Sequence, residues 1–204
     1  MNNQLIAIEG IDGSGKSTLA KYLIEELIKI NQKVELVSTR ESKYEHIFAE
    51  VCEGYELNPA SEAYMFFFQF LHAHKVDRAI KAMSDGKIVI ADRWDLSFFA
   101  WHENLGFFSN ELPELREAIS RLAFKNLKPS LGIYLDVPVE TALQRRLLKR
   151  GEVIDDLEAE KKLYQKGINA YRMLADSNGW ITIDASDSFE KVKYTTWGLV
   201  KNTL

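Results

Sequence analysis

Short apolar segments recur along the chain and are separated by longer segments of mixed polarity. The five apolar segments are Leu5–Ile8, Val34–Val37, Ile88–Ala91, Leu131–Leu135 and Trp180–Ile183. An unbroken apolar run of this length is typical of a central parallel strand, because helices cover both of its faces. The segments between them are long enough for crossover helices, which we expect near residues 60–84, 112–126, 138–150, 157–176 and 188–201. The alternation predicts a doubly wound α/β domain that binds its ligands at the carboxyl ends of the strands.

A glycine-rich loop joins the first predicted strand to a helix. Residues Gly10–Ser17 match the pattern G-x-x-x-x-G-K-S/T, and leucines recur at helical spacing from Lys16 onward. The glycines allow backbone N–H groups to surround phosphate oxygens, and the positive end of the helix dipole adds to the attraction. We expect Lys16 to reach the β- and γ-phosphates of ATP and the Ser17 hydroxyl to bind Mg²⁺. The residues expected to bind ATP here are Gly10, Gly13, Ser14, Gly15, Lys16, Ser17 and Thr18.

The loop and the strand pattern together define the expected fold. It is a P-loop NTPase-like three-layer α/β/α fold with a five-stranded parallel sheet and a short lid. We interpret residues 145–157 as the lid, because basic residues at its start are followed by Gly151 and by the acids Glu152, Asp155 and Asp156. No internal repeat, low-complexity tract or proline-rich linker is present, so we expect residues 1–204 to form a single P-loop domain.

Charged residues follow two of the predicted strands. Asp92 and Arg93 end the third strand, at the edge of the sheet where the phosphate loop lies. We expect Asp92 to hold Mg²⁺ through water and Arg93 to bind an acceptor phosphate with two hydrogen bonds. Arg40 follows the second strand and offers another guanidinium to the same crevice. A surface ion pair is the alternative at both strand ends, and for Arg40 it is nearly as well supported.

Basic side chains at the start of the lid can bind a nucleotide: those of Arg145, Arg146, Lys149 and Arg150. Arginines that fold over ATP would neutralise charge on the transferred phosphoryl group and exclude water. A solvated helix face is the alternative for each of them. Acids follow these residues directly, which makes a nucleic-acid-binding patch a weak interpretation.

A predicted helix carries the segment Met65–Leu71, which is aromatic on all sides. Since a surface helix would not be, we expect most of this segment in the core. One of its phenylalanines can still stack on a nucleobase, and the Gln69 amide can hydrogen-bond a base edge. His72 and His74 do not share a helix face, so they predict no metal pair.

Composition limits the remaining classes of function. The net charge of −4 and the pI of about 5.7 give no general attraction to nucleic acid or anionic lipid. Cys52 is the only cysteine, which excludes an intrachain disulfide and fits a reducing cytosol. The first residues lack the basic region of a signal peptide, and the most apolar stretch, Ala63–Leu71, is shorter than the roughly 20 residues of a membrane span. We expect a cytoplasmic protein whose partners are small nucleotides, not nucleic acid or membranes.

These elements together resemble the thymidylate kinase family along nearly the whole chain. The segment Ile8–Thr18 is similar to the phosphate loop of that family. Asp92-Arg93-Trp94 resembles its D-R-Y element, and Ala100-Trp101-His102 stands where the family usually has A-Y-Q. The segments that resemble its strand end, lid entry and adenine-side loop are Leu135–Pro138, Lys149–Glu152 and Asp184–Ser186. Many folds share the phosphate loop, but the combination of elements in this order is specific.

The resemblance implies that ATP, with Mg²⁺, donates its γ-phosphate to the 5′-phosphate of a deoxynucleoside monophosphate, most of all dTMP. The implied catalytic residues are Lys16, Asp12, Arg93 and Arg150, and Asp12 would face the acceptor nucleotide and its sugar. Arg145 and Arg150 would close over ATP, and Ala185 would lie on the adenine side. The implied acceptor-binding residues are Asp12, Arg40, Phe66, Gln69, Phe70, Arg93, Ser97 and Trp101. Positioning and charge neutralisation supply most of the catalysis, so no covalent protein intermediate is needed.

The chain departs from the family pattern mainly on the acceptor side and in the lid. Phe66 aligns with a phenylalanine that stacks on thymine, but Phe70 replaces an arginine that hydrogen-bonds the base, and His72 replaces a glutamine. Asp156 takes the place of a lid arginine, whereas Gly13 in place of a basic residue indicates that the lid supplies the catalytic arginine. Loss of a buried hydrogen-bond partner costs more than about 1 kcal/mol, enough to change the base preference about tenfold. The reaction is therefore predicted more firmly than the base.

Two other functions stay open from the sequence. The first is a deoxynucleoside kinase, which phosphorylates a hydroxyl and would need a general base such as Glu9. The second is a nucleotide-binding module that has lost catalysis, which Asp156 in the lid suggests. For the oligomeric state, the apolar helix at 63–71 and the aromatic residues between Trp94 and Phe108 would suit the surface of a homodimer.

Overall fold

The computed structural model describes residues 4–38, 50–52, 54–58, 61–104, 113–151 and 153–204. Its strands are β1 (Leu5–Glu9), β2 (Val34–Ser38), β3 (Ile88–Asp92), β4 (Leu131–Asp136) and β5 (Ile181–Asp184). They form one sheet in the order β2-β3-β1-β4-β5, and every neighbouring pair is parallel. The five-stranded parallel sheet predicted from the apolar segments is confirmed.

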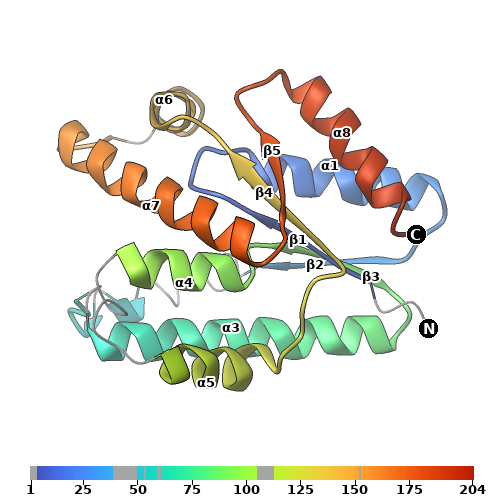
Figure 1. The fold of residues 1–204 in the computed structure, drawn as a ribbon, viewed down its shortest axis with the longest axis horizontal. Helices are drawn as coiled ribbons and strands as arrows, with labels where there is room; N and C mark the ends of the chain where they lie inside the picture. The colour runs from blue at the N-terminus through green and yellow to red at the C-terminus, as the bar shows by residue number, and fades with distance from the viewer. Residues whose placement is uncertain (1–3, 39–49, 53, 59–60, 105–112, 152) are drawn as a thin grey trace.

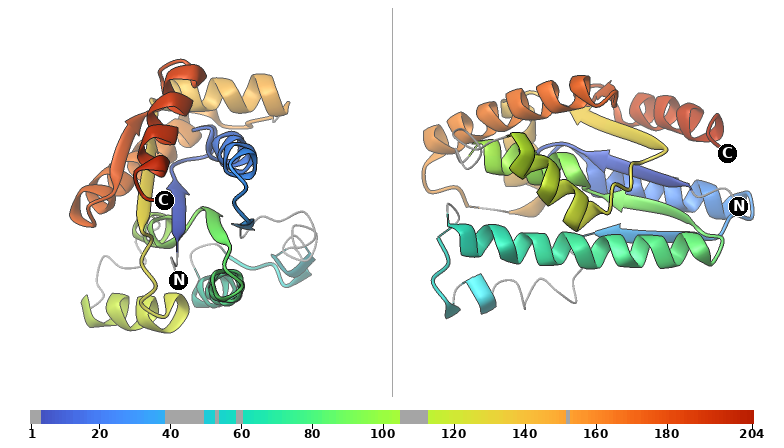
Figure 2. Two further views of the ribbon diagram at one scale, coloured as in Figure 1. Left: turned by 90° about the vertical axis from the view of Figure 1, so that its right-hand side faces the viewer. Right: turned by 60° about the horizontal axis from the view of Figure 1, so that its bottom comes forward.

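Helices cover both faces of this sheet. They are α1 (Lys16–Lys29), α3 (Glu62–Ser84), α4 (Asp95–Asn104), α5 (Pro113–Phe124), α6 (Val139–Arg150), α7 (Leu157–Ser177) and α8 (Phe189–Lys201). Figure 1 shows α1 and α8 together on one side, with α3, α4, α5 and α7 on the other. The two further views in Figure 2 show the same three layers. Among the described helices, none combines the length and the apolar character needed to cross a lipid bilayer.

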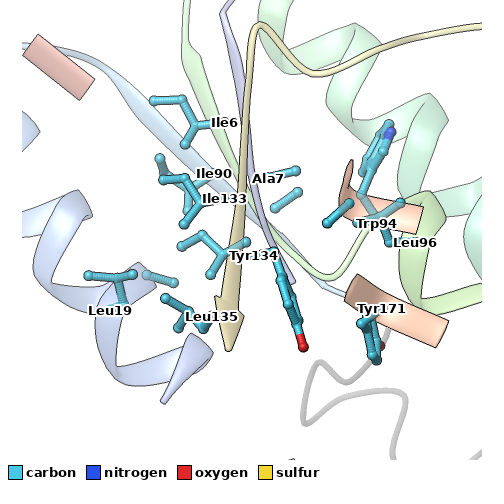
Figure 3. Close-up of a cluster of buried hydrophobic side chains, with 14 of the residues drawn as sticks. Ile6, Ala7, Leu19, Ile90, Trp94, Leu96, Ile133, Tyr134, Leu135 and Tyr171 are labelled. Atoms are coloured by element: carbon cyan, nitrogen blue, oxygen red, sulfur yellow. The ribbon is translucent and has the colours of Figure 1, made fainter. Parts of the chain in front are cut away.

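Side chains of β4 alternate between the two faces of the sheet and divide the core into two parts. Ile133 and Leu135 lie on the same side as Leu19 of α1 (Figure 3). Tyr134 points to the other side, where its ring stacks on Tyr171 of α7 with centroids 5.6 Å apart. Trp94 lies on this second side too. The second part of the core therefore reaches from the middle of the sheet to the helices that follow the ends of the strands.

Polar side chains cap two of the long helices. Ser61 accepts a hydrogen bond from the Tyr64 backbone N–H at the start of α3, at 3.3 Å. Asp156 accepts one from the Ala159 N–H at the start of α7, at 2.9 Å. Each cap satisfies one of the N–H groups that a helix leaves without an intrahelical partner. Asp156 thus has a local structural role.

The sequence did not predict α4. We expected aromatic residues from Trp94 onward to suit a dimer surface, but Trp94, Phe98 and Phe99 are all at most 7% exposed. These side chains fill the core between α4 and its neighbours. A helix that is buried on most of its sides shows no amphipathic period, which is why the pattern gave no helix here. Trp94, Phe98 and Phe99 are therefore not available to a dimer surface, whereas Trp101 is half-buried.

The expectation for the first half of α3 was also wrong. In the segment predicted to lie mostly in the core, Met65 is buried, but Phe66 and Phe70 are 65% and 64% exposed. These two residues lie four positions apart, so they are neighbours on one face of the helix. An exposed pair of aromatic rings needs a functional explanation.

Candidate active site

The loop between β1 and α1 has a backbone that requires glycine. Gly10 and Gly13 have φ angles of 144° and 87°. A Cβ atom at Gly10 would lie 2.7 Å from the Leu135 carbonyl oxygen, and one at Gly13 would overlap the carbonyl oxygen of Ala142 in α6. The loop thus packs through bare backbone on β4 and α6. The first turn of α1 follows directly, and its free N–H groups adjoin the loop.

The ammonium group of Lys16 lies inside this loop. Lys16 is 5% exposed, and its Nζ donates to the Ile11 carbonyl oxygen at 2.7 Å. The Asp12 carboxylate lies 3.9 Å away. Burial lowers the pKa of Lys16 to about 7, with Arg93 acting in the same direction and nearby carboxylates opposing it. Because the nearby carboxylates offset the effect of burial only in part, a phosphate group bound here would stabilise the charged form of Lys16.

Two serine hydroxyls of the loop have distinct surroundings. The Ser14 hydroxyl oxygen is buried and has no hydrogen-bond partner among the described residues. The Ser17 hydroxyl donates to the Asp92 carboxylate at 2.6 Å. A hydroxyl and a carboxylate side by side are oxygen ligands of the kind that Mg²⁺ prefers. The predicted metal residues, Ser17 and Asp92, are thus brought together.

No larger metal-binding cluster accompanies them. In the described part of the chain, no group of three or more histidine, cysteine, aspartate or glutamate side chains could hold a metal ion. Mg²⁺ typically keeps several waters and binds through one or two protein ligands together with substrate phosphates. The small donor set of Ser17 and Asp92 fits that mode of binding.

Arg93 follows β3 and points back toward the phosphate loop. It is 6% exposed, and its Nη1 donates to the Gly10 carbonyl at 3.1 Å and to the Ser97 hydroxyl at 2.9 Å. The same nitrogen donates to the Tyr171 hydroxyl at 3.0 Å, and Nη2 donates to the Asp12 carboxylate. Since a guanidinium has five N–H groups, the Nε–H and one Nη2–H are left without a partner among the described residues. Arg93 therefore keeps donors that can bind a phosphate.

A buried carboxylate organises the chain around Arg93. Glu9, the last residue of β1, is fully buried, and its Oε1 accepts from the backbone N–H groups of Trp94 at 2.6 Å and Ser97 at 2.9 Å. Its Oε2 accepts from the Ser97 hydroxyl, which lies 2.8 Å from the Tyr171 hydroxyl. Ser97, predicted to bind the acceptor, is 3% exposed. In this structure Ser97 contacts Arg93 and Glu9 beneath the site.

The charges in this network shift one another's ionisation. Burial raises the pKa of Glu9, while Arg93 and the three hydrogen bonds oppose the shift. Burial acts to lower the pKa of Arg93, but the carboxylates near it, Asp12 first, outweigh burial and raise it. Burial also raises the pKa of the Tyr171 hydroxyl, so Tyr171 stays neutral. Arg93 is thus a permanent cation.

The lid residues are described in part. Arg145 of α6 donates from Nη2 to the Ala185 carbonyl at 2.9 Å, so two residues predicted for the ATP side lie together. Arg146 instead contacts the Glu160 carboxylate and the Tyr164 hydroxyl of α7. The side chain of Arg150 lies outside the described part of the structure, and so does all of Arg40. Thr18 is exposed in the first turn of α1.

On the acceptor side, α3 presents Phe66, Gln69 and Phe70. Both polar atoms of the Gln69 amide are buried and have no hydrogen-bond partner within the described residues. Trp101 of α4 is half-buried. His72 is 3% exposed and packs against Phe124 with ring centroids 5.2 Å apart, so it belongs to the core and does not face a base.

Sequence reasoning missed Tyr171 and Lys75, which shape this site, and gave Glu9 only as a candidate general base. Tyr171 reaches Arg93 from α7, and Glu9 holds the turn after β3. Lys75 of α3 is 2% exposed and donates to the Arg93 carbonyl at 2.8 Å. A charged residue at a buried helical position is a visible signal in the sequence, but its partner depends on how distant elements pack.

The geometry is that of a phosphate loop facing a buried arginine, and comparison with known proteins identifies its family. The family model described as thymidylate kinase matches residues 8–195. The thymidylate kinase of Ligilactobacillus salivarius (strain UCC118) is 31% identical, with 99% of each chain covered. Those of Blochmanniella floridana and Nitrobacter winogradskyi are 32% and 33% identical, covering 94% and 95% of this chain and 92% and 86% of their own. With a matching loop, a matching strand end and relatives along nearly its whole length, the chain belongs to the thymidylate kinase family.

Proposed function

We propose that this chain transfers the γ-phosphate of ATP to the 5′-phosphate of dTMP. The observation that carries the proposal is the position of Arg93, whose guanidinium donates to Gly10 and Asp12 in the phosphate loop itself. An acceptor phosphate bound by Arg93 would therefore lie next to a γ-phosphate bound by the loop. The family membership supports dTMP as the acceptor.

For the donor, the loop N–H groups and Lys16 would bind the triphosphate, and Ser17 with Asp92 would hold Mg²⁺. The buried Ser14 hydroxyl fits a phosphate oxygen as its partner. Bound Mg²⁺ supplies charge neutralisation at the β- and γ-phosphates. A triphosphate beside Lys16 would raise its pKa again, so that the lysine carries a full charge when ATP is bound.

For the acceptor, Arg93 would bind the 5′-phosphate through the donors that the protein leaves available. An oxygen of that phosphate attacks the γ-phosphorus while the bond from this phosphorus to the β–γ bridging oxygen breaks, and ADP leaves. Asp12, now paired with Arg93, would turn to the sugar of the acceptor. The chain contributes position and positive charge, and no bond to the protein forms.

We also propose that residues 145–157 act as a lid over ATP. Arg145 already contacts Ala185 on the side expected for adenine. Arg150 lies at the end of α6, just before Gly151, which ends the helix with a φ angle of 64°. Because a side chain at Gly13 would collide with α6, the phosphate loop has no room for a basic residue there. The catalytic arginine would then come from the lid, with Arg150 as the candidate.

The base of the acceptor would meet the first half of α3. Lys75 contacts the end of β3, and Gln69 precedes it by six residues, about 9 Å along a helix that runs antiparallel to that strand. Gln69 thus lies beyond the carboxyl ends of the strands, where a nucleotide held at Arg93 would extend. Its amide can both donate to and accept from a base edge, and the exposed rings of Phe66 and Phe70 are adjacent.

Neither alternative function has equal support. A deoxynucleoside kinase would need Glu9 as a general base, but both carboxylate oxygens of Glu9 accept hydrogen bonds from Trp94 and Ser97 within the core. The case for a module without catalysis rested on Asp156, which caps α7. Family membership and the intact phosphate loop favour an active kinase.

A single kinase domain over residues 1–204, a homodimer and a cytoplasmic location stay predictions. Light scattering after gel filtration tests the second. A homodimer would have twice the chain mass of 23.4 kDa, and a species at the chain mass would refute it.

A coupled assay for ADP tests the proposed reaction. With ATP and Mg²⁺, we expect turnover of dTMP and none of thymidine, and we expect Arg93→Ala to raise the KM for dTMP far more than the KM for ATP. Turnover of thymidine alone would favour the nucleoside kinase. Tight ATP binding without turnover of any deoxynucleoside monophosphate would favour the module that has lost catalysis.

A further inference from the structure

The buried lysine of α3 has no place in phosphate transfer as described so far. The Lys75 ammonium donates to the Arg93 carbonyl oxygen at 2.8 Å and lies 3.3 Å from the His72 Nδ1. It also lies 5.0 Å from the centroid of the Trp94 ring. Lys75 is 2% exposed, and its ammonium faces backbone and core side chains and not the phosphate loop.

The backbone that Lys75 contacts has an uncommon conformation. Arg93 has a φ angle of 71°, in the left-handed region that side chains other than glycine rarely adopt. Such a conformation is strained and persists only where the surroundings enforce it. The conformation turns the chain at the end of β3, and the guanidinium of the same residue points at the phosphate loop.

Three hydrogen bonds enforce this conformation. The Arg93 N–H donates to the Ile8 carbonyl at 2.9 Å and extends the β1–β3 pairing. Both polar groups of the next peptide unit, between Arg93 and Trp94, are hydrogen-bonded to side chains. Its N–H donates to the Glu9 carboxylate at 2.6 Å, and its carbonyl oxygen accepts from the Lys75 ammonium at 2.8 Å. We call Glu9 and Lys75 the peptide clamp. Rotation of this peptide would break both of its hydrogen bonds.

The charges of the two clamp residues indicate a role beyond filling space in the core. A buried ammonium is costly, because burial removes its hydration, and an apolar residue at position 75 would fill the space without that cost. An ammonium facing a carbonyl on one side of a peptide, and a carboxylate facing its N–H on the other, match the direction of the peptide dipole. The two charges therefore oppose the reversal of this one peptide specifically.

We propose that Lys75 is a positioning residue for the acceptor phosphate: with Glu9 it fixes the Arg93–Trp94 peptide and thereby aims the Arg93 guanidinium. This inference rests on the proposed role of Arg93 in acceptor binding. Lys75 acts through the backbone, since its ammonium meets the Arg93 carbonyl and not the guanidinium. We expect the main effect on the acceptor, because the Lys75 ammonium contacts the Arg93 carbonyl and His72 and, among the described residues, forms no hydrogen bond with the phosphate loop.

Kinetics of Lys75→Met test the inference, because methionine preserves most of the side-chain volume but cannot donate. The expected result is an increase of about tenfold or more in the KM for dTMP, with the KM for ATP changed less than about twofold. Val76→Ala is the control, since Val76 is buried on the same helix and its side chain cannot form a hydrogen bond. This control should lower thermal stability without separating the two KM values. Equal changes in both KM values of Lys75→Met, or none, would overturn the proposal.

Two further measurements keep the test decisive. In an Arg93→Ala background, adding Lys75→Met should change the KM for dTMP by less than about twofold, because Lys75 acts only through Arg93, and full additivity would overturn the proposal. Hydrogen exchange at the Trp94 amide should be faster in Lys75→Met than in the wild type, and unchanged exchange would contradict the clamp. This exchange is independent of dTMP, so it separates failure of the clamp from failure of the proposed function. If Lys75→Met does not fold, Lys75→Gln is measured the same way and should show a smaller change in the same direction.

Discussion

Replacement of Gln69 by methionine should stabilise the free protein while it weakens the reaction. Both polar atoms of the amide are buried, and neither has a hydrogen-bond partner among the described residues. An unsatisfied buried group costs about 1–3 kcal/mol, and methionine has a similar shape without the amide. At roughly 2–4 °C per kcal/mol for a chain of this size, Gln69→Met should raise the melting temperature by roughly 2–12 °C.

The effect on turnover should have the opposite sign. If the Gln69 amide hydrogen-bonds the acceptor base, its loss should lower kcat/KM for dTMP by about tenfold or more, and it should leave the KM for ATP nearly unchanged. Thermal unfolding with and without dTMP, together with steady-state kinetics, measures both effects. Gln165→Met is the matched control, because Gln165 is an exposed glutamine of α7. A lower melting temperature with unchanged kcat/KM would refute both the unsatisfied amide and its role in base recognition.

Four other measurements test the site and the residues around it. Lys16→Ala should reduce kcat by about a hundredfold or more with the fold preserved, and near wild-type rates would contradict its role. Because burial lowers the pKa of Lys16 to about 7 in the free protein, binding of ATP and Mg²⁺ at pH 8 should take up a proton, which calorimetry in two buffers measures. Lys16→Ala should abolish this proton uptake, and the absence of proton uptake in the wild type would contradict the prediction. Phe70→Arg should shift kcat/KM among four deoxynucleoside monophosphates toward dTMP, and an unchanged ranking would mean that the alignment of α3 is wrong. Burial lowers the pKa of Lys75 from 10.5 to about 8, so between pH 8 and pH 10.5 the native state binds fewer protons than the unfolded state. The free energy of unfolding of the wild type should therefore rise by up to roughly 3 kcal/mol relative to that of Lys75→Met by pH 10.5, as measured by denaturant titrations. A difference that does not change with pH would refute this.

The fold could be predicted because its signals are local. Each strand is a short apolar run, and the phosphate loop is a contiguous pattern whose glycines have no substitute, as the space around Gly10 and Gly13 confirms. The exception is α4, where burial on most sides removes the polar face that would reveal a helix. Periodicity therefore fails for elements that lie wholly inside the core.

The site could be predicted only where its residues follow strand ends. Asp92 and Arg93 come directly after an apolar run, which identified them. Glu9, Lys75 and Tyr171 belong to three elements far apart in the sequence, and only the packing of β1, α3 and α7 brings them to Arg93. Ser97 stays a prediction as an acceptor-binding residue, and the structure adds that its hydroxyl is buried against the Arg93 guanidinium.

The contact between Gly13 and the backbone of α6 limits how this enzyme can be altered. The carbonyl oxygen of Ala142 occupies the space into which any side chain at position 13 would extend. An arginine at position 13, in place of the proposed lid arginine, would therefore require an outward shift of α6, and a single substitution could not achieve it. In protein engineering and in natural evolution alike, α6 would have to shift before a basic residue could be accommodated at position 13.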